Sequence, residues 1–262
     1  MKKQKTYAVL NLIVVILVIA WNGLSNSGII GGKTVGNVSY DLYNLFTPAG
    51  YAFAIWGIIF LGLIANGIYQ VAVAFGSNEE DKKNVLTGPW LILANLANGV
   101  WIWFWLNEYI GVSVLIMIVL LLCLIKVAID LRLENHGPKR AVIILGWWPN
   151  TIYLGWISVA LIANVAAYLS QIGWADGVNE VIYTIIMIIV AAVLNLFMLY
   201  ARNMREFCLV GIWALMAIAA RSEIESIYYT AVISSAVIAL LTLIHGVMNL
   251  KENTLIFPKK VD

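Results

Sequence analysis

The stretch FTPAGYAFAIWG, residues 46–57, lies where a polar segment gives way to a long apolar run. A Pro-Ala-Gly turn that begins at Pro48 is followed directly by Tyr51, Phe53 and Trp56. Aromatic rings at the start of an apolar helix are typical of the membrane interface, where they anchor the helix. The same rings could instead cover a binding cavity, and this stretch alone leaves both interpretations open.

The composition places the 262-residue chain among integral membrane proteins. Hydrophobic residues make up 62% of it and charged residues 11%, and the mean hydropathy is +0.90. A soluble domain of this size could not bury so much apolar surface, so we expect a lipid bilayer as its partner and no nucleic acid. The two cysteines, Cys123 and Cys208, lie in apolar runs and predict neither a disulfide nor a metal site.

Eight apolar runs approach the length that crosses a bilayer, about 20 residues. The first run begins with the basic residues of a signal peptide but has no cleavage site after it, so we expect a retained helix. The seventh run is the shortest, and a re-entrant segment is the alternative there. The predicted spans are 7–23, 51–75, 89–107, 110–130, 143–169, 181–201, 207–221 and 228–248.

The distribution of positive charge predicts the topology. With the amino terminus in the cytoplasm, fourteen of the 16 Lys and Arg residues fall on the cytoplasmic side, leaving only Lys33 and Arg221 outside. Cytoplasmic loops of membrane proteins carry this excess. A re-entrant seventh segment would move the C-terminal lysines outside, so we predict eight spans with both termini cytoplasmic. The basic inner loops suit a bacterial plasma membrane.

The chain divides into two regions by composition. Residues 1–175 hold ten of the 11 tryptophans and form a predicted five-helix bundle, whereas 176–262 form three aliphatic helices and a short cytoplasmic tail. The loop 24–50 is rich in Gly, Ser and Asn but ends in bulky apolar residues, which predicts a partly packed lid. Small residues in AVISSAVIAL, 231–240, would permit close helix contacts and are compatible with assembly or a homodimer.

Polar and aromatic side chains repeat at helical spacing on three of the predicted helices. Amides in hydrocarbon cost free energy unless they are paired, so these stripes should face one another and enclose an aromatic-walled pocket under the loop. Ordinary helix packing explains small and amide residues equally well. The stripes are Trp56, Leu63, Asn66 and Gln70; Asn95, Asn98, Trp101 and Trp105; and Pro149, Tyr153, Trp156, Ala160 and Asn164.

Three stretches resemble the TspO/MBR family of tryptophan-rich sensory proteins, also called translocator proteins. TPAGYAFAIWGIIF, 47–60, looks like the proline–aromatic–Trp start of that family's second helix. LANLANGVWIWFW, 93–105, is similar to its third helix, in which Asn98 and Trp101 hold the Asn and Trp places. IYLGWISVALIANVAAYL, 152–169, resembles its fifth helix.

The chain also departs from the family pattern. Ile152 and Gly155 stand where the family has proline and alanine, and Pro48 is one proline where typical members carry two. Tyr51 stands near a usual tryptophan. Typical members have five helices, and the resemblance covers 7–170, so the last three helices have no counterpart in them.

The resemblance implies a five-helix bundle with a pocket under the first loop that takes flat hydrophobic ligands such as porphyrins. It therefore predicts a membrane receptor or sensor with a porphyrin- or haem-like ligand and no required cofactor or metal. It also makes Asn98 a candidate hydrogen-bond donor. The predicted ligand-binding residues are Pro48, Tyr51, Phe53, Trp56, Asn95, Asn98, Trp101, Trp105, Tyr153, Trp156 and Asn164.

Other functions stay open on the sequence alone. All eight helices could carry a small hydrophobic solute, although the charges cluster at the ends of the runs and disfavour an ion-coupled carrier. The C-terminal helices could instead make the protein a membrane scaffold. An enzyme is disfavoured because mid-membrane carboxylate pairs and a Ser/His/Asp set are lacking, which leaves tryptophan-assisted porphyrin photodegradation by analogy.

Overall fold

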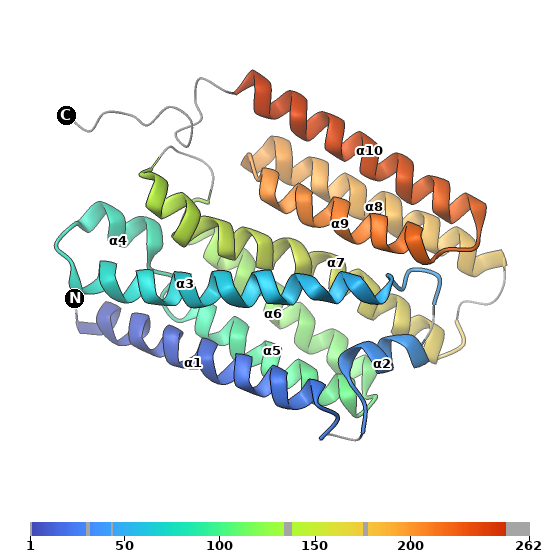
Figure 1. Cartoon of the computed structure of the whole chain (residues 1–262), viewed down its shortest axis with the longest axis horizontal. Helices are drawn as coiled ribbons and strands as arrows, with labels where there is room; N and C mark the ends of the chain where they lie inside the picture. The colour runs from blue at the N-terminus through green and yellow to red at the C-terminus, as the bar shows by residue number, and fades with distance from the viewer. Residues whose placement is uncertain (1, 30–31, 43, 134–137, 175–177, 250–262) are drawn as a thin grey trace.

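The computed structural model describes residues 2–29, 32–42, 44–133, 138–174 and 178–249 (Figure 1). These residues form helices and turns and no strand, which confirms the all-α prediction. The predicted cytoplasmic tail falls largely in residues 250–262, outside the described residues. The helices are α1 (Lys2–Asn26), α2 (Val35–Asp41), η1 (Gly50–Ala54), α3 (Ile55–Phe75), α4 (Glu79–Val85), α5 (Trp90–Leu106), α6 (Ile110–Asp130), η2 (Val142–Trp147), α7 (Trp148–Gln171), α8 (Val178–Arg202), α9 (Arg205–Arg221) and α10 (Glu225–Met248).

Seven helical segments of the described chain are long and apolar enough to cross a bilayer, so the protein is an integral, multi-pass membrane protein. The predicted seventh span corresponds to α9, whose 17 residues extend about 25 Å, at the short end of spanning helices. It lies beside α8 and α10 (Figure 1). Helix α1 begins and α10 ends at the same end of the bundle, as eight crossings require. The count of eight stays a prediction.

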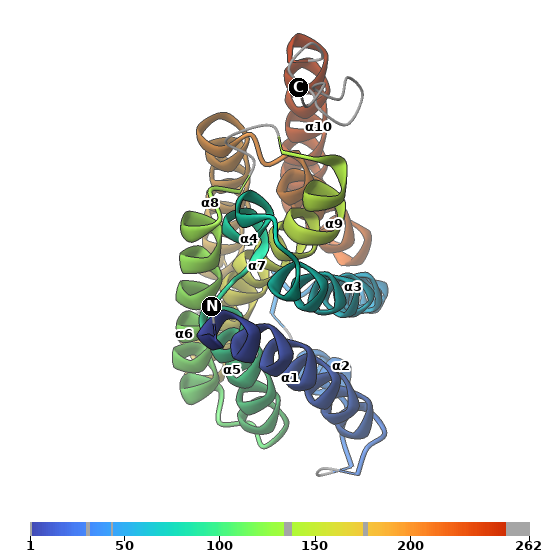
Figure 2. The same cartoon turned by 90° about the vertical axis from the view of Figure 1, so that its left-hand side faces the viewer.

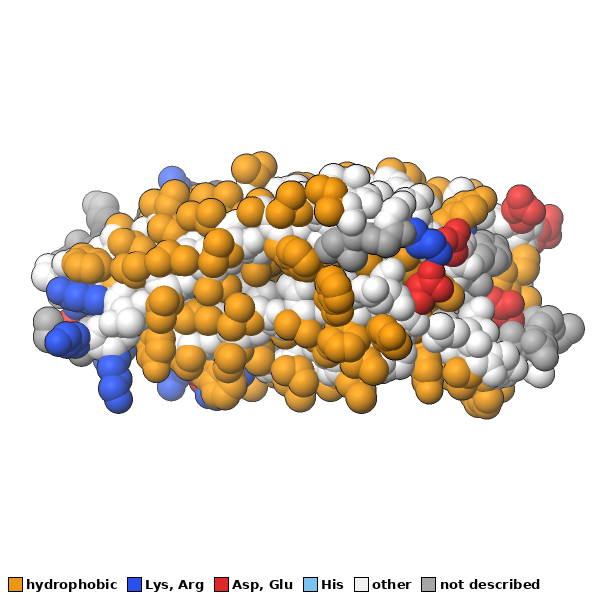
Figure 3. Space-filling view, turned by 90° about the horizontal axis from the view of Figure 1, so that it is seen from below, with side chains coloured by type: hydrophobic (Ala, Val, Ile, Leu, Met, Phe, Trp, Pro, Cys, Tyr) orange, Lys and Arg blue, Asp and Glu red, His pale blue; other side chains and the backbone are white. Residues whose placement is uncertain are grey.

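Charged side chains separate along the bundle. On the face shown in Figure 3, hydrophobic side chains cover the middle, most Lys and Arg lie at the end where α1 begins, and Asp and Glu gather at the opposite end. We call these the N-terminal end and the lid end. The separation agrees with the predicted orientation, in which the basic end faces the cytoplasm. The orientation itself stays a prediction.

Helix α7 lies near the centre of the arrangement when the bundle is viewed along its length (Figure 2). It packs against α3 and α6 on one side and against α8 and α9 on the other. The predicted boundary near residue 175 therefore separates two groups of helices that share α7 as a common contact. The division into 1–175 and 176–262 stays a prediction.

The start of α7 explains one feature of the fifth predicted span. Because Pro149 has no N–H, it cannot donate to the carbonyl of Leu145, and the chain here forms the π-helical segment η2. The side-chain amide of Asn66 in α3 donates to Leu145 O at 2.9 Å and to Gly146 O at 3.2 Å. Gly62 permits this approach, since a Cβ there would lie 3.2 Å from Pro149 Cβ. Thus α3 stabilises the break in the helix.

Gly155 marks a second close approach, between α7 and α9. A Cβ at this position would lie 3.2 Å from Val210 Cβ and 3.4 Å from the backbone of Phe207. The glycine that stands in place of the family's alanine is therefore a point of close packing between α9 and α7.

Candidate functional site

The loop before α3 packs on the lid end of the bundle. Thr34 caps α2 by accepting a hydrogen bond from the N–H of Asn37, whose side chain in turn accepts from the N–H of Thr34. This reciprocal capping box starts a helix of only seven residues. Val35 and Val38 of α2 are buried, so α2 covers the bundle with an apolar face.

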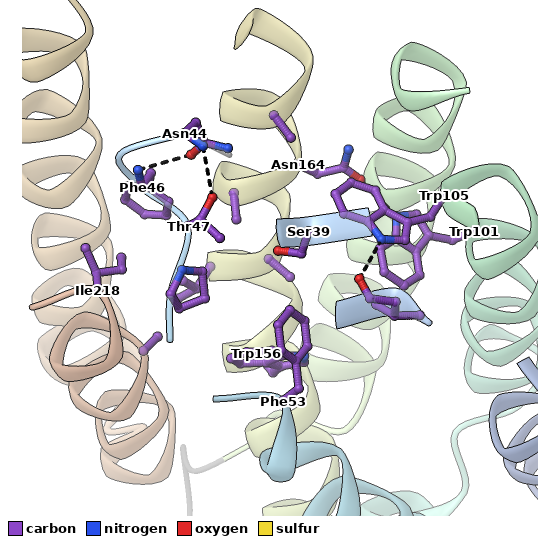
Figure 4. A pocket seen from close by; sticks show the side chains of 17 residues that line it. Ser39, Asn44, Phe46, Thr47, Phe53, Trp101, Trp105, Trp156, Asn164 and Ile218 are labelled. Atoms are coloured by element: carbon purple, nitrogen blue, oxygen red, sulfur yellow. Dashed lines mark hydrogen bonds between the residues drawn. The ribbon is translucent and has the colours of Figure 1, made fainter. Parts of the chain in front are cut away.

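A small cavity, which we call the aromatic cavity, lies under this loop (Figure 4). Its volume is about 50 Å³ for the centres of water-sized spheres. The loop, α5, α7 and α9 each contribute to its wall. The lining residues are Val35, Ser39, Asn44, Phe46, Thr47, Pro48, Phe53, Trp101, Trp105, Trp156, Val159, Ala160, Ala163, Asn164, Ala167, Ala214 and Ile218.

Two tryptophans of α5 form a flat wall whose polar edges are already bonded. The rings of Trp101 and Trp105 stack with centroids 5.5 Å apart and planes 24° apart. The indole N–H of Trp101 donates to Asn164 Oδ1 at 2.8 Å, and that of Trp105 donates to Val35 O at 3.1 Å. Because both edges are fixed by the protein, an aromatic surface remains for contact with a ligand.

The third indole differs in its hydrogen bonding. Trp156 of α7 is 4% exposed, and its indole N–H has no partner among the described residues. Phe53 meets its ring edge to face at a centroid distance of 6.2 Å. A buried N–H without an acceptor costs free energy, so a ligand oxygen or ring nitrogen that accepts from Trp156 would be stabilised here.

A second hollow, the side cavity, lies next to the aromatic cavity. Its volume by the same measure is about 520 Å³, and it is lined by residues of α1, the loop, α3 and α5. Trp56 and Phe60 line it and stack with centroids 5.1 Å apart. Val35, Phe53 and Trp101 line both hollows, so these three residues lie between them.

The structure distributes the predicted ligand-binding residues over three places. The stripes predicted one pocket, but the structure has two hollows in its place, and Trp56 lines only the side cavity. Four residues line neither: Tyr51, Asn95, Asn98 and Tyr153. Six of the eleven line the aromatic cavity: Pro48, Phe53, Trp101, Trp105, Trp156 and Asn164.

The four remaining residues are engaged within the protein. Asn98 donates to the hydroxyl of Tyr153 at 2.9 Å, and both are buried, so the predicted donor to the ligand pairs with a protein group instead. Asn95 donates to Leu91 O, one turn back in its own helix. Tyr51 packs its ring edge against Trp213 of α9, 5.2 Å between centroids.

Several lining residues were not among the predicted ones. Val159, Ala163 and Ala167 continue the face of α7 that carries Trp156, so helical spacing was a usable signal for them. Asn44 and Thr47 bond to each other's backbone in a tight turn, which an Asn in a polar loop hints at. Ala214 and Ile218 of α9 gave no signal, since nothing in an aliphatic helix indicates which face meets a cavity.

The lining of the aromatic cavity is mostly apolar. Its described residues include five aromatic side chains and several small aliphatic ones and no charged group. General acid–base catalysis needs a titratable side chain within hydrogen-bond reach of the substrate, and this lining offers none. Apolar walls with a few placed polar groups are the usual composition of a small-molecule site.

Comparison with known proteins adds one result. A family model described as TSPO-like protein matches residues 8–244. The match runs from α1 into α10 and therefore includes the three C-terminal helices. No curated protein and no solved structure matches the chain.

Proposed function

Since the chain belongs to the TSPO-like protein family, we propose that it is a membrane receptor or sensor for a flat hydrophobic ligand of the porphyrin type, bound between α3, α5 and α7. The observation that carries the proposal is the aromatic cavity, in which three indoles and Phe53 surround an uncharged space under the loop. In a bacterial plasma membrane, the predicted location, the lid end would face outward.

The arrangement of the indoles favours a planar ligand with a polar acceptor. The stacked pair Trp101 and Trp105 presents a rigid aromatic surface, and ring stacking contributes about 0.5–1.5 kcal/mol per contact beyond area burial. Trp156 supplies a donor whose acceptor is lacking among the described residues. A tetrapyrrole has both an extended ring face and carboxylate groups, so it meets both requirements.

The two volumes indicate how such a ligand would fit. Sites for drug-sized ligands measure about 300–1,000 Å³. The aromatic cavity, at about 50 Å³, is too small in this structure, whereas the side cavity, at about 520 Å³, is in range. We propose that the ring system enters through the side cavity and displaces Phe53, so that the two hollows join into one site.

The test is titration of the purified protein in lipid nanodiscs with protoporphyrin IX, followed by the shift of the porphyrin's own absorption band. Trp156→Phe keeps a ring but removes the N–H, so we expect about 3- to 10-fold weaker binding. Trp156→Ala, which also removes the ring, should weaken binding further. Because the signal comes from the porphyrin, removing a tryptophan does not itself change it, as it would in a measurement of tryptophan fluorescence.

The matched control is Trp103→Phe, because Trp103 is a half-exposed tryptophan of the same bundle that lines neither hollow. This variant should bind as the unaltered protein does. Equal binding by all three variants, at the level of empty nanodiscs, would show partition into lipid and overturn the proposal.

A further inference from the structure

The C-terminal helices contact the lid at the segment we call the hinge, residues 44–52. Its backbone forms hydrogen bonds to α8 and α9 at three points. Leu45 N–H donates to Glu180 Oε1 of α8 at 2.9 Å, and Ala49 N–H donates to Ala217 O of α9 at 2.9 Å. Trp213 Nε1 of α9 donates to Ala52 O at 3.1 Å.

Side chains reinforce the same contact. The guanidinium of Arg221 lies 5.0 Å from the centroid of the Tyr40 ring and donates to Pro48 O at 3.4 Å. Trp213 also holds the ring of Tyr51 edge to face. Trp213, Ala217 and Arg221 are spaced by four and therefore form one ridge of α9, and this ridge follows the hinge.

The neighbouring ridge of α9 faces the ligand site. Ala214 and Ile218, each one residue after a hinge contact, line the aromatic cavity. One helix thus forms a wall of the cavity and bonds the segment that covers it. Figure 4 shows Ile218 across the cavity from Trp101 and Trp105.

We propose that α9 belongs to the ligand-binding site and latches the hinge, so that α9 and Glu180 set how fast a ligand enters and leaves. The inference rests on the proposed function for the identity of the ligand, but the latch itself is a property of the protein alone. Phe53, which lies between the two hollows, directly follows Ala52, whose carbonyl is held by Trp213. We expect a backbone shift that displaces Phe53 to loosen this contact with α9.

The hinge needs this partner for a physical reason. Residues 44–49 of the hinge lie in a non-helical segment between α2 and η1, where the regular helical bonds of the backbone are missing. Buried backbone groups without partners cost free energy in a membrane protein. Because α8 and α9 supply the acceptors for Leu45 and Ala49, the closed position of the hinge depends on helices far away in the sequence.

The first measurement uses no ligand. Hydrogen exchange of the hinge amides is followed in nanodiscs for the full chain and for Trp213→Phe, which keeps a ring beside Tyr51 but cannot donate to Ala52 O. We expect the amides of Leu45 and Ala49 to exchange about fivefold faster in the variant. The control is Trp103→Phe, which should leave their exchange unchanged.

A second pair of variants tests the latch independently, in case Trp213→Phe impairs folding. Glu180→Gln keeps a side-chain oxygen that can accept from Leu45 N–H, whereas Glu180→Leu does not. We expect Glu180→Leu to speed exchange of the Leu45 amide and Glu180→Gln to restore it close to the original rate. Unchanged exchange in both Trp213→Phe and Glu180→Leu would overturn the latch.

The second measurement uses protoporphyrin IX. Dissociation from Trp213→Phe should be about fivefold faster than from the unaltered protein. Faster hinge exchange with unaltered binding rates would overturn the link between α9 and the ligand site. If the unaltered protein binds no porphyrin, the proposed function fails, and the exchange rates alone then decide whether the latch exists.

Discussion

Two groups of buried amides, one toward each end of the bundle, differ in what they bond to. Toward the N-terminal end, Asn66 bonds the carbonyls of Leu145 and Gly146 and accepts from Gln70 at 2.7 Å. Gln70 in turn accepts from the hydroxyl of Thr87 at 3.0 Å. These bonds satisfy backbone carbonyls at the break in the helix, join the two amides to each other and join Gln70 to a hydroxyl.

Toward the lid end, amides bond the edges of aromatic rings. Asn164 accepts from the indole of Trp101, and Asn98 donates to the hydroxyl of Tyr153. The bonds of this group fix ring edges, and the Trp101 ring lines both hollows, whereas those of the other group bond backbone carbonyls and polar side chains. The comparison shows that buried amides support a break in a helix in one place and hold an aromatic side chain beside a cavity in the other.

The largest expected effect comes from removing the central amide of the filled end. Asn66→Leu keeps the volume but leaves the carbonyl of Leu145 without its side-chain donor, beside a proline that cannot replace it. We expect the free energy of unfolding to fall by about 1–3 kcal/mol. Unfolding by a denaturing detergent, monitored by circular dichroism, measures the change.

The matched control for Asn66→Leu is Asn95→Leu. Asn95 is also a buried amide, but it bonds only the turn before it in its own helix, so its loss should cost less than about 1 kcal/mol. Porphyrin binding should survive Asn66→Leu, since Asn66 lines neither hollow. Equal losses in both variants would mean that the break at Pro149 needs no support from α3.

The all-helical membrane fold could be predicted because it follows from length and hydropathy, which act along the chain. The faces of α5 and α7 could be predicted in part, since Trp101, Trp156 and Asn164 lie at helical spacing. The lid could not be predicted in detail, because the seven-residue helix α2 depends on a local cap and on burial of Val35. The bond from Asn98 to Tyr153 could not be predicted because Tyr153 lies on another helix, and the role of Asn98 toward a ligand stays a prediction.

The contribution of α9 could not be read from the sequence at all. Its contacts with the hinge join residues more than 150 positions apart, such as Ala52 and Trp213, and they depend on how α9 seats against α7. Gly155 was visible as a departure from the family pattern, but its meaning depends on Val210 and Phe207, which pack there. A residue that differs from the family pattern can indicate a changed packing contact, but it does not show which residues form the other side of that contact.

An intermediate effect is expected at Gly155, between the two groups of amides. In Gly155→Ala, the added methyl favours the helix by about 1 kcal/mol, but it must fit 3.2 Å from Val210 Cβ and 3.4 Å from the Phe207 backbone. Overpacking of this kind costs about 1–3 kcal/mol, and a backbone neighbour yields little. We expect the free energy of unfolding to fall by about 1 kcal/mol in the same detergent titration, and the Ala49 amide to exchange faster as α9 moves outward.

Gly57→Ala is the control, because a Cβ there meets nothing within 4 Å. A more stable Gly155→Ala variant would show that the contact between α7 and α9 is loose.

The smallest effect is expected on the outer surface of the lid, where Lys33 pairs with Glu108 at 2.6 Å and with Asp41 at 2.9 Å. The hydrogen bonds that Lys33 donates to these carboxylates, the one to Glu108 first, raise the pKa of Lys33 above its ordinary 10.5. The stabilisation from these ion pairs is therefore fully present below the pKa of Lys33 in the unfolded chain and is lost only as the pH rises through its higher pKa in the folded protein.

Exposed ion pairs contribute little to stability and are screened by salt. We expect Lys33→Gln to speed exchange of the α2 amides slightly at pH 7 and low salt, and to match the unaltered protein in high salt or above the folded pKa. A larger effect than that of Trp213→Phe would mean that surface charge, and not α9, holds the lid closed.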